Sequence, residues 1–349
     1  MENQTEQSAE QTGGKKTRKK PSLLLITVIL GTIGFVVQLL WVNWPKPVAE
    51  PEPLNAELAA VIDRLPGTSD ALFYAGLKDI KESSFWKEVM PDSLKEMSWL
   101  PLDKTMKEIV SETGFVPARD LDTLLIAFQQ QNTKRQKYLG ILWGAFDGKL
   151  TTEYLKEKSI ETRKYGNEEC YALSDTLWVC RPGDRQVLLA NSSQLLRGFL
   201  EPEKNFLVRD STTASLIDKA IHKSHTWLTL SSTKWTLGGL QSLTSGNKDV
   251  KTLGNLNRIR QLAISLKFDD GVEGQTEWIY PSRTSAYFAS TFLWTAIKLS
   301  SSSGTRTTEP AKALLKELDV MQNLESVIVK TDLPLSFFKP ESENGENSK

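Results

Sequence analysis

The sequence predicts an α+β protein with a single N-terminal transmembrane helix and a body of two ferredoxin-like (split βαβ) halves, each a sheet with helices. Three observations lead to this prediction. An unbroken apolar run stands near the N-terminus, short strand-like runs recur after it, and helical patterns separate those runs. Two passes through the order strand, helical connection, hairpin, helix and strand correspond to the ferredoxin-like unit.

The apolar run extends from Leu23 to Val42, and its least apolar residue is Gln38. At 1.5 Å of rise per residue it would cover about 30 Å, the thickness of the hydrocarbon core of a bilayer. We therefore expect a transmembrane helix, an uncleaved signal-anchor, over residues 23–44. The alternative is a signal peptide cleaved after Pro47-Val48-Ala49, but the run is longer than a signal core and proline fits a cleavage site poorly.

A basic cluster stands directly before this run and predicts its orientation. The positive-inside rule keeps the N-terminus in the cytoplasm and places the body outside, so we expect a single-pass inner-membrane protein with a periplasmic body. Trp41 and Trp44 are expected to anchor the outer end at the membrane interface. The residues expected to set the topology are Lys15, Lys16, Arg18, Lys19 and Lys20.

Composition shifts divide the rest of the chain. Residues 1–22 are polar and predict a disordered basic tail, and residues 339–349 predict a disordered acidic tail. Residues 45–53 are rich in proline and predict a stiff stalk. Between the stalk and the acidic tail we expect a first α+β domain over residues 54–203 and a second over residues 204–338.

In the first domain, apolar and alternating runs predict strands over residues 71–75, 121–128, 138–146, 161–173, 176–181 and 186–191. Helical patterns occupy residues 54–65, 83–97, 102–113, 150–156 and 192–200. Gly114 suits a helix end, and Ser192 suits a helix N-cap.

In the second domain, strands are predicted over residues 225–231, 260–268, 272–280 and 324–329. Helices are predicted over residues 211–222, near Leu237, near Val250, over 282–299 and from Pro310 through Leu318. In the segment 260–268, strict alternation places Leu262, Ile264, Leu266 and Phe268 on one face.

The two cysteines, Cys170 and Cys180, flank a hairpin turn at Ser174-Asp175. A three-residue loop would place them directly opposite one another, close enough for a disulfide bridge. A two-residue turn would shift the register by one residue and separate them. A bridge and two free, half-buried thiols are therefore both open. No metal site is expected, because no histidine lies near these thiols in sequence.

One segment, Gly114-Phe115-Val116-Pro117-Ala118-Arg119-Asp120-Leu121-Asp122, resembles a group of membrane-anchored bacterial proteins of unknown function. The outer part of those proteins carries a Gly-Phe-x-Pro-x-Arg-Asp-Leu-Asp segment, and the resemblance covers about residues 70–200. It supplies no catalytic residues. In physical terms, Pro117 and Asp120 predict a turn into the strand at Leu121, and Arg119 is expected to pair with a carboxylate.

The sequence carries no recognised catalytic motif. Ser84-x-x-Lys87 and Ser231-x-x-Lys234 lack the partner motifs of serine acyl-enzymes, and no Walker loop or Gly-x-Ser-x-Gly elbow is present. His222 and His225 are expected at the surface rather than as metal ligands. We therefore expect a protein that is not an enzyme and needs no cofactor.

These observations favour an interaction or accessory role. The 43 basic and 43 acidic residues balance, so no electrostatic footprint for nucleic acid is present. We expect a membrane-anchored, extracytoplasmic protein that contacts the lipid bilayer through residues 23–44 and binds a protein partner, as in a subunit of an envelope or membrane-protein complex. The alternative is a module that binds a lipid, glycan or peptide in a groove between its two halves.

Overall fold

The computed structural model describes residues 23–95, 104–130, 136–203, 205–234, 258–302 and 307–339. The chain divides into two compact units, Met1–Trp44 and Pro45–Lys349. The second unit contains all of the described strands. The predicted basic topology residues, from Lys15 to Lys20, and the predicted acidic tail from residue 340 lie outside the described residues.

The first unit contains helix α1 (Leu23–Asn43), where a helix was expected. In the described part of the chain, however, no helix is long and apolar enough to cross a membrane. The predicted signal-anchor over 23–44 is corrected accordingly, together with the single-pass inner-membrane location and the periplasmic body. Trp41 and Trp44 were predicted to anchor the outer end of that transmembrane helix, so this prediction no longer has the membrane span on which it rested.

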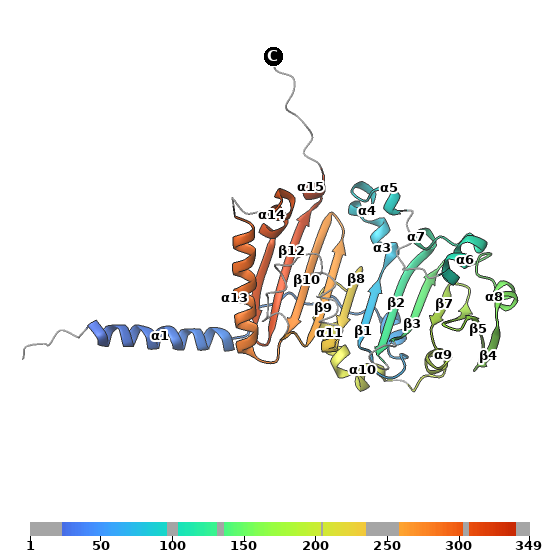
Figure 1. Ribbon diagram of the computed structural model, residues 1–349, viewed down its shortest axis with the longest axis horizontal. Coiled ribbons are helices and arrows are strands. Elements are labelled where there is room, and N and C mark those ends of the chain that lie inside the picture. The colour runs from blue at the N-terminus through green and yellow to red at the C-terminus, as the bar shows by residue number, and fades with distance from the viewer. Residues whose placement is uncertain are drawn as a thin grey trace, which may run out of the picture. The chain divides into compact units, whose positions relative to one another are not determined.

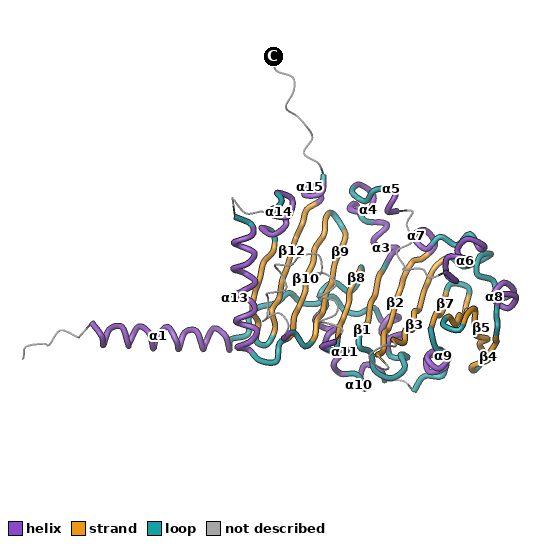
Figure 2. Tube along the Cα trace, in the orientation of Figure 1, coloured by secondary structure: helices purple, strands orange, loops and turns teal. Residues whose placement is uncertain are grey.

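The second unit is built on one twelve-stranded sheet in which all neighbouring strands are antiparallel (Figures 1 and 2). Its strand order is β11-β12-β10-β9-β8-β1-β2-β3-β7-β6-β5-β4. The α+β class is retained, but the two ferredoxin-like halves are wrong. Strand β1 pairs with β2 on one side and with β8 on the other. The strands that were expected to form two separate sheets, each with its own edges, therefore form one continuous sheet.

The strands are β1 (Ala71–Ala75), β2 (Leu121–Gln130), β3 (Gln136–Gly144), β4 (Glu161–Tyr165), β5 (Glu168–Ser174), β6 (Leu177–Gly183), β7 (Gln186–Ala190), β8 (Thr226–Leu230), β9 (Gln261–Phe268), β10 (Gly271–Ile279), β11 (Leu318–Asn323) and β12 (Ser326–Pro334). Strand β11 was not predicted, and only its first residue, Leu318, lay in a predicted element, the end of a helix. Its burial alternates only weakly, so periodicity did not identify it.

The helices of the second unit are α2 (Ala56–Ile62), α3 (Leu77–Glu82), α4 (Ser84–Glu88), α5 (Asp92–Lys95), α6 (Lys104–Thr113), α7 (Pro117–Asp120), α8 (Thr152–Lys158), α9 (Ser193–Leu200), α10 (Phe206–Arg209), α11 (Ser211–Lys219), α13 (Arg283–Ser300), α14 (Glu309–Lys316) and α15 (Leu335–Phe338). Gly114, with φ +65°, follows α6, as expected for a helix end.

One face of the sheet carries the largest core. Leu72, Leu125, Ile141 and Leu188 point to this face, where each is fully buried. Helices α2, α9, α10 and α11 contribute apolar side chains to the same cluster, which also contains Trp227. This core holds both cysteines and fixes the orientation of every strand that it contacts.

Among the described residues, helices pack against the opposite face mainly towards its two ends. Helices α6 and α8 pack over β2, β3, β5, β6 and β7, whereas α13 packs over β11 and β12. Between these two groups of helices, successive cross-strand partners form a row of side chains on this face. The row consists of Ile126, Phe73, Leu228, Ile264, Thr276 and Val329. The candidate site lies on this middle part of the face.

Residues 45–53 have no regular secondary structure, and several contact the sheet unit. Lys46 Nζ donates to the backbone oxygen of Gln322 at 2.8 Å. The backbone N–H of Glu52 donates to Ile221 O at 2.9 Å, and the Glu52 carboxylate accepts from Lys223 N at 2.7 Å. The segment predicted as a stalk is therefore hydrogen-bonded to the body at both ends.

Cys170 and Cys180 lie directly opposite one another in β5 and β6, and both are buried free thiols. The connecting turn is tight, because Ser174 is paired with Leu177. That turn alone would separate the cysteines, but a register shift between Ala172 and Ser174 restores their alignment. The disulfide stays a prediction.

Candidate binding pocket

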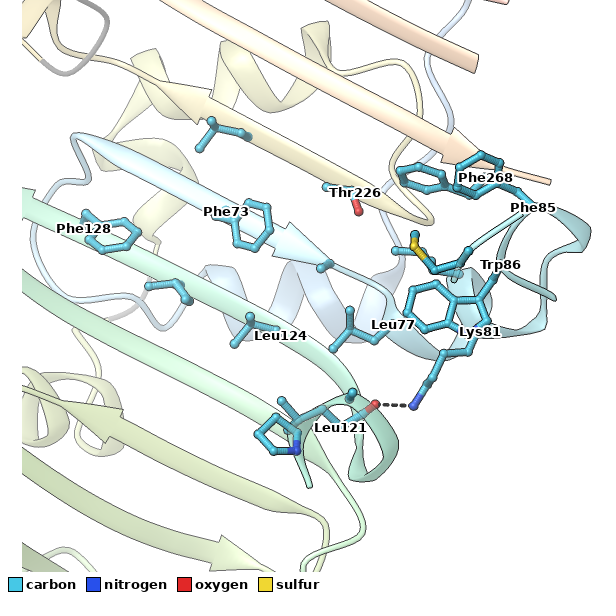
Figure 3. A pocket seen from close by; sticks show the side chains of 17 residues that line it. Phe73, Leu77, Lys81, Phe85, Trp86, Leu121, Leu124, Phe128, Thr226 and Phe268 are labelled. Carbon is cyan, nitrogen blue, oxygen red and sulfur yellow. Dashed lines mark hydrogen bonds between the residues drawn. The ribbon is translucent and has the colours of Figure 1, made fainter. Parts of the chain in front are cut away.

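A cavity of about 580 Å³ lies on the middle of the partly covered sheet face (Figure 3). Its floor is formed by β8, β1 and β2, and its lining comes from both the 54–203 and the 204–338 parts of the chain. The volume is in the range of sites that hold drug-sized ligands. The lining residues are Phe73, Ala75, Leu77, Ile80, Lys81, Phe85, Trp86, Met90, Pro117, Ala118, Leu121, Leu124, Ile126, Phe128, Thr226, Leu228 and Phe268.

The floor is apolar because the strand alternation places every second residue on this face. Phe73 in β1 lies opposite Ile126 in β2 and opposite Leu228 in β8. One step along, Ala75 lies opposite Leu124 and Thr226. The other face of the same strands is buried in the main core, so these strands are apolar on both faces.

The first wall of the pocket is the helical connection after β1. Ser83 is the N-cap of α4: its side-chain oxygen accepts from Trp86 N at 3.1 Å and donates to Ile80 O at 2.6 Å. This cap ends α3 and starts α4 in a fixed orientation, with Phe85 and Trp86 each only 8% exposed. The short helices therefore hold two aromatic rings over one end of the floor.

The same wall is attached to the far side of the pocket. Phe85 N donates to the backbone oxygen of Asp269 at 3.0 Å, in the turn after β9. The ring of Phe85 lies 5.6 Å from the ring of Phe268, centroid to centroid. The wall formed by α4 is thereby tied to a segment almost two hundred positions later in the chain.

The second wall is α7, part of the Gly114–Asp122 segment. Pro117 is at the start of this one-turn helix, and Pro117, Ala118 and Leu121 line the pocket. The Asp120 carboxylate accepts from Val116 N at 2.8 Å and from Arg119 Nε at 2.7 Å. The expected pairing of Arg119 with a carboxylate is thus present, and the packing role of the segment also shapes the pocket.

Among the described residues that line this pocket, Lys81 is the one charged side chain. Its ammonium group donates to Leu121 O at 2.7 Å, drawn as the dashed line in Figure 3, and to Arg119 O at 3.1 Å. Burial lowers the pKa of Lys81, and the nearby charges of Asp122 and Asp120 offset part of that effect. The pocket thus has an apolar floor and one cationic end.

The described lining offers few polar groups. Thr226 is the one hydroxyl in the lining, and neither histidine lines the pocket. Within the described ranges, no group of three or more His, Cys, Asp or Glu side chains could hold a metal ion. The arrangement can remove an apolar body from water and offer its end a hydrogen-bonding cation.

Of the residues singled out from the sequence, Pro117, Leu121 and Phe268 line this pocket, whereas the two cysteines and the two histidines do not. His222 and His225 were expected at the surface, but both are buried, at 9% and 5% exposure. His225 Nδ1 accepts from Phe268 N at 2.9 Å, and burial lowers the pKa of this imidazole. One feature of the sequence could have indicated the pocket floor. The segment 121–128 is apolar without strict alternation, which is typical of a strand that packs on both faces.

Comparison with known proteins identifies no family, because no protein-family model and no curated protein matches the sequence. Among solved structures, TP0453 in crystal form I is similar with a TM-score of 0.40 and 10% identity, over 79% of this chain and 93% of that chain. Crystal form IV of TP0453 gives a TM-score of 0.39 and 9% identity, over 85% and 97%.

Proposed function

We propose that this protein is a non-enzymatic binding protein that holds an apolar small molecule in the pocket over β8, β1 and β2. The observation that carries the proposal is a cavity of about 580 Å³ whose lining is apolar except for Lys81 and Thr226. Concave apolar sites with a few placed polar groups are the usual form of small-molecule sites in proteins.

The physical argument is that an open pocket of this kind leaves apolar surface in contact with water. Phe73, Ile126 and Leu228 are only partly buried, although the other face of their strands is packed in the main core. Covering such surface yields roughly 25 cal/mol per Å². A ligand with an apolar body would gain this free energy, whereas a glycan would bring hydroxyl groups that this floor cannot satisfy.

The test is binding of Nile red, a neutral apolar dye whose emission shifts to the blue in an apolar site. We expect saturable binding by the full chain and a loss of about tenfold or more in affinity for Leu228→Gln, because that change places an amide on the floor. Leu173→Gln is the matched control, since Leu173 is also a partly buried strand leucine but lies outside the pocket. Equal binding by all three proteins would refute the proposal.

A second candidate is the protein-interaction role expected from the sequence. The observation that favours it is helix α13, where Phe288, Phe292 and Leu299 are 55%, 41% and 64% exposed and share one face of the helix. Crosslinking of the native complex, compared between the natural chain and Phe292→Asp, tests it. A partner that crosslinks equally well to both proteins would count against this face.

A further inference from the structure

We infer that the pocket selects single-chain amphiphiles that end in a carboxylate, and that Lys81 is the residue that recognises this group. The inference rests on the proposed function and adds to it the chemical class of the ligand.

The cation is at one end of the apolar floor. Lys81 Nζ donates to Leu121 O, and Leu121 is the lining residue at the start of β2. The floor continues along the same strand through Leu124 and Ile126 to Phe128. At about 3.3 Å per residue, the part from Leu124 to Phe128 is about 13 Å long. Figure 3 shows Leu124 and Phe128 following one another along β2 away from Lys81. A ligand with a charged head at Lys81 would therefore lay its chain along β2.

The ammonium group retains a donor for a ligand. A lysine side chain carries three N–H groups, and the structure assigns two of them, to Leu121 O and Arg119 O. Both partners are backbone carbonyls from one side, the α7 wall. They hold the head of Lys81 at the pocket end and are neutral acceptors, so neither of these two hydrogen bonds is an ion pair.

The neighbouring carboxylates are engaged elsewhere. Asp120 pairs with Arg119 at 2.7 Å and with Lys149 at 2.5 Å, and Asp122 pairs with Arg185 at 2.6 Å. Within the part of the chain that the structure describes, no carboxylate forms an ion pair with Lys81. A half-buried cation with no anionic partner favours an anionic ligand, because charge-assisted hydrogen bonds to carboxylates are about twice as strong as neutral ones.

The test compares three ligands with the same twelve-carbon chain, each below its micelle concentration: dodecanoate, 1-dodecanol and dodecyltrimethylammonium. Their binding to the full chain is measured by isothermal titration and by displacement of Nile red. We expect dodecanoate to bind roughly tenfold or more tightly than 1-dodecanol, the effect of one charged hydrogen bond, and the cationic ligand to bind most weakly.

Variants of Lys81 separate recognition of the charge from folding. Lys81→Met should lose the preference for dodecanoate and keep the affinity for Nile red, because its side chain retains the apolar stem. Lys81→Arg should keep the preference. Lys78→Met is the matched control, since Lys78 is on the same helix but lines a different cavity.

The outcomes distinguish the two proposals. Binding of Nile red with equal affinity for dodecanoate and 1-dodecanol would overturn the role of Lys81 and leave the apolar pocket standing. An unchanged preference for dodecanoate in Lys81→Met would also overturn that role. Absence of binding by Nile red and by all three amphiphiles would overturn the proposed function itself.

Discussion

At the scale of single residues, Asp120 has the most clearly defined electrostatic role. Asp120 is 5% exposed. Its carboxylate accepts a hydrogen bond from Val116 N and forms ion pairs with Arg119 and Lys149. Burial by itself would raise the pKa of Asp120, but the hydrogen bonds from Arg119, Lys149 and Val116 outweigh burial and hold the pKa at about 2. The charged form of this carboxylate therefore stabilises the turn that forms the α7 wall.

This arrangement predicts a pH-dependent contribution to stability. Because the folded pKa lies below the ordinary value of 3.8, the contribution is complete above about pH 4 and is lost as pH falls towards 2. We expect Asp120→Asn to lower the free energy of unfolding by about 2 kcal/mol at pH 7. The difference from the natural chain should shrink as pH falls from 4 to 2, as followed by urea denaturation.

Asp122→Asn is the control for that prediction. Asp122 is two residues along the chain and pairs with Arg185, whose side chain is 74% exposed. Exposed ion pairs contribute about 0–1 kcal/mol, so this variant should unfold close to the natural chain at every pH. Equal losses of stability for the two variants would contradict a special role for Asp120.

At the scale of elements, one glycine sets how closely β3 and α7 approach. A Cβ added to Gly144 would overlap the backbone carbonyl oxygen of Asp120 and would lie 3.1 Å from the Cα of Leu121. Ala145 N also donates to that carbonyl at 2.8 Å. The backbone of β3 therefore supports the α7 turn directly, and a side chain at Gly144 would separate them.

We expect Gly144→Ala to lower the free energy of unfolding by about 1–3 kcal/mol, because backbone atoms cannot move aside as the end of a flexible side chain can. It should also weaken binding of Nile red, since Pro117 and Ala118 of the displaced turn line the pocket. Gly183→Ala is the matched control: Gly183 is also a strand glycine, and nothing lies within 4 Å of its added Cβ. Thermal unfolding of the two variants is the measurement, and an equal loss of stability in both would contradict the role of Gly144.

At the scale of the whole molecule, the central fact is that β1 joins all other strands into one sheet. It pairs with β2 over Ala71–Ala75 and with β8 over the same residues. Leu72, in the middle of this strand, is fully buried in the main core. Two independent halves would unfold separately, whereas one continuous sheet couples the strands on both sides of β1.

We therefore expect Leu72→Ala to lower the free energy of unfolding by about 2–5 kcal/mol, the cost of a cavity at a buried leucine. Hydrogen exchange should increase together in β2 and β3 on one side and in β8 and β9 on the other. Leu314→Ala serves as the comparison, because Leu314 is 40% exposed on α14. Faster exchange on one side of β1 alone would point to two separate folding units.

Sequence reasoning identified most strands and helices because burial on one face imposes period 2 on a strand and period 3.6 on a helix. The strand at 260–268 with its four apolar residues on one face, the helix at 282–299 and the pairing of Arg119 with a carboxylate are all present. The pocket was not identified. Its residues are the ordinary apolar side chains of strands, and nothing local distinguishes a row that is covered by a helix from one that is not.

The sequence by itself determined the α+β class, the short elements and the neutral charge, since these depend on local periodicity and composition. The tertiary structure decided the pairings: β1 with β8, the register shift that aligns Cys170 with Cys180, and the tie between Phe85 and the turn after β9. These contacts join residues far apart in the chain, and their free energy comes from burial and hydrogen bonding that exist only once the strands are assembled. The pocket with Lys81 at its end belongs to this second group, because its floor and its charged end come from segments that only the folded sheet brings together.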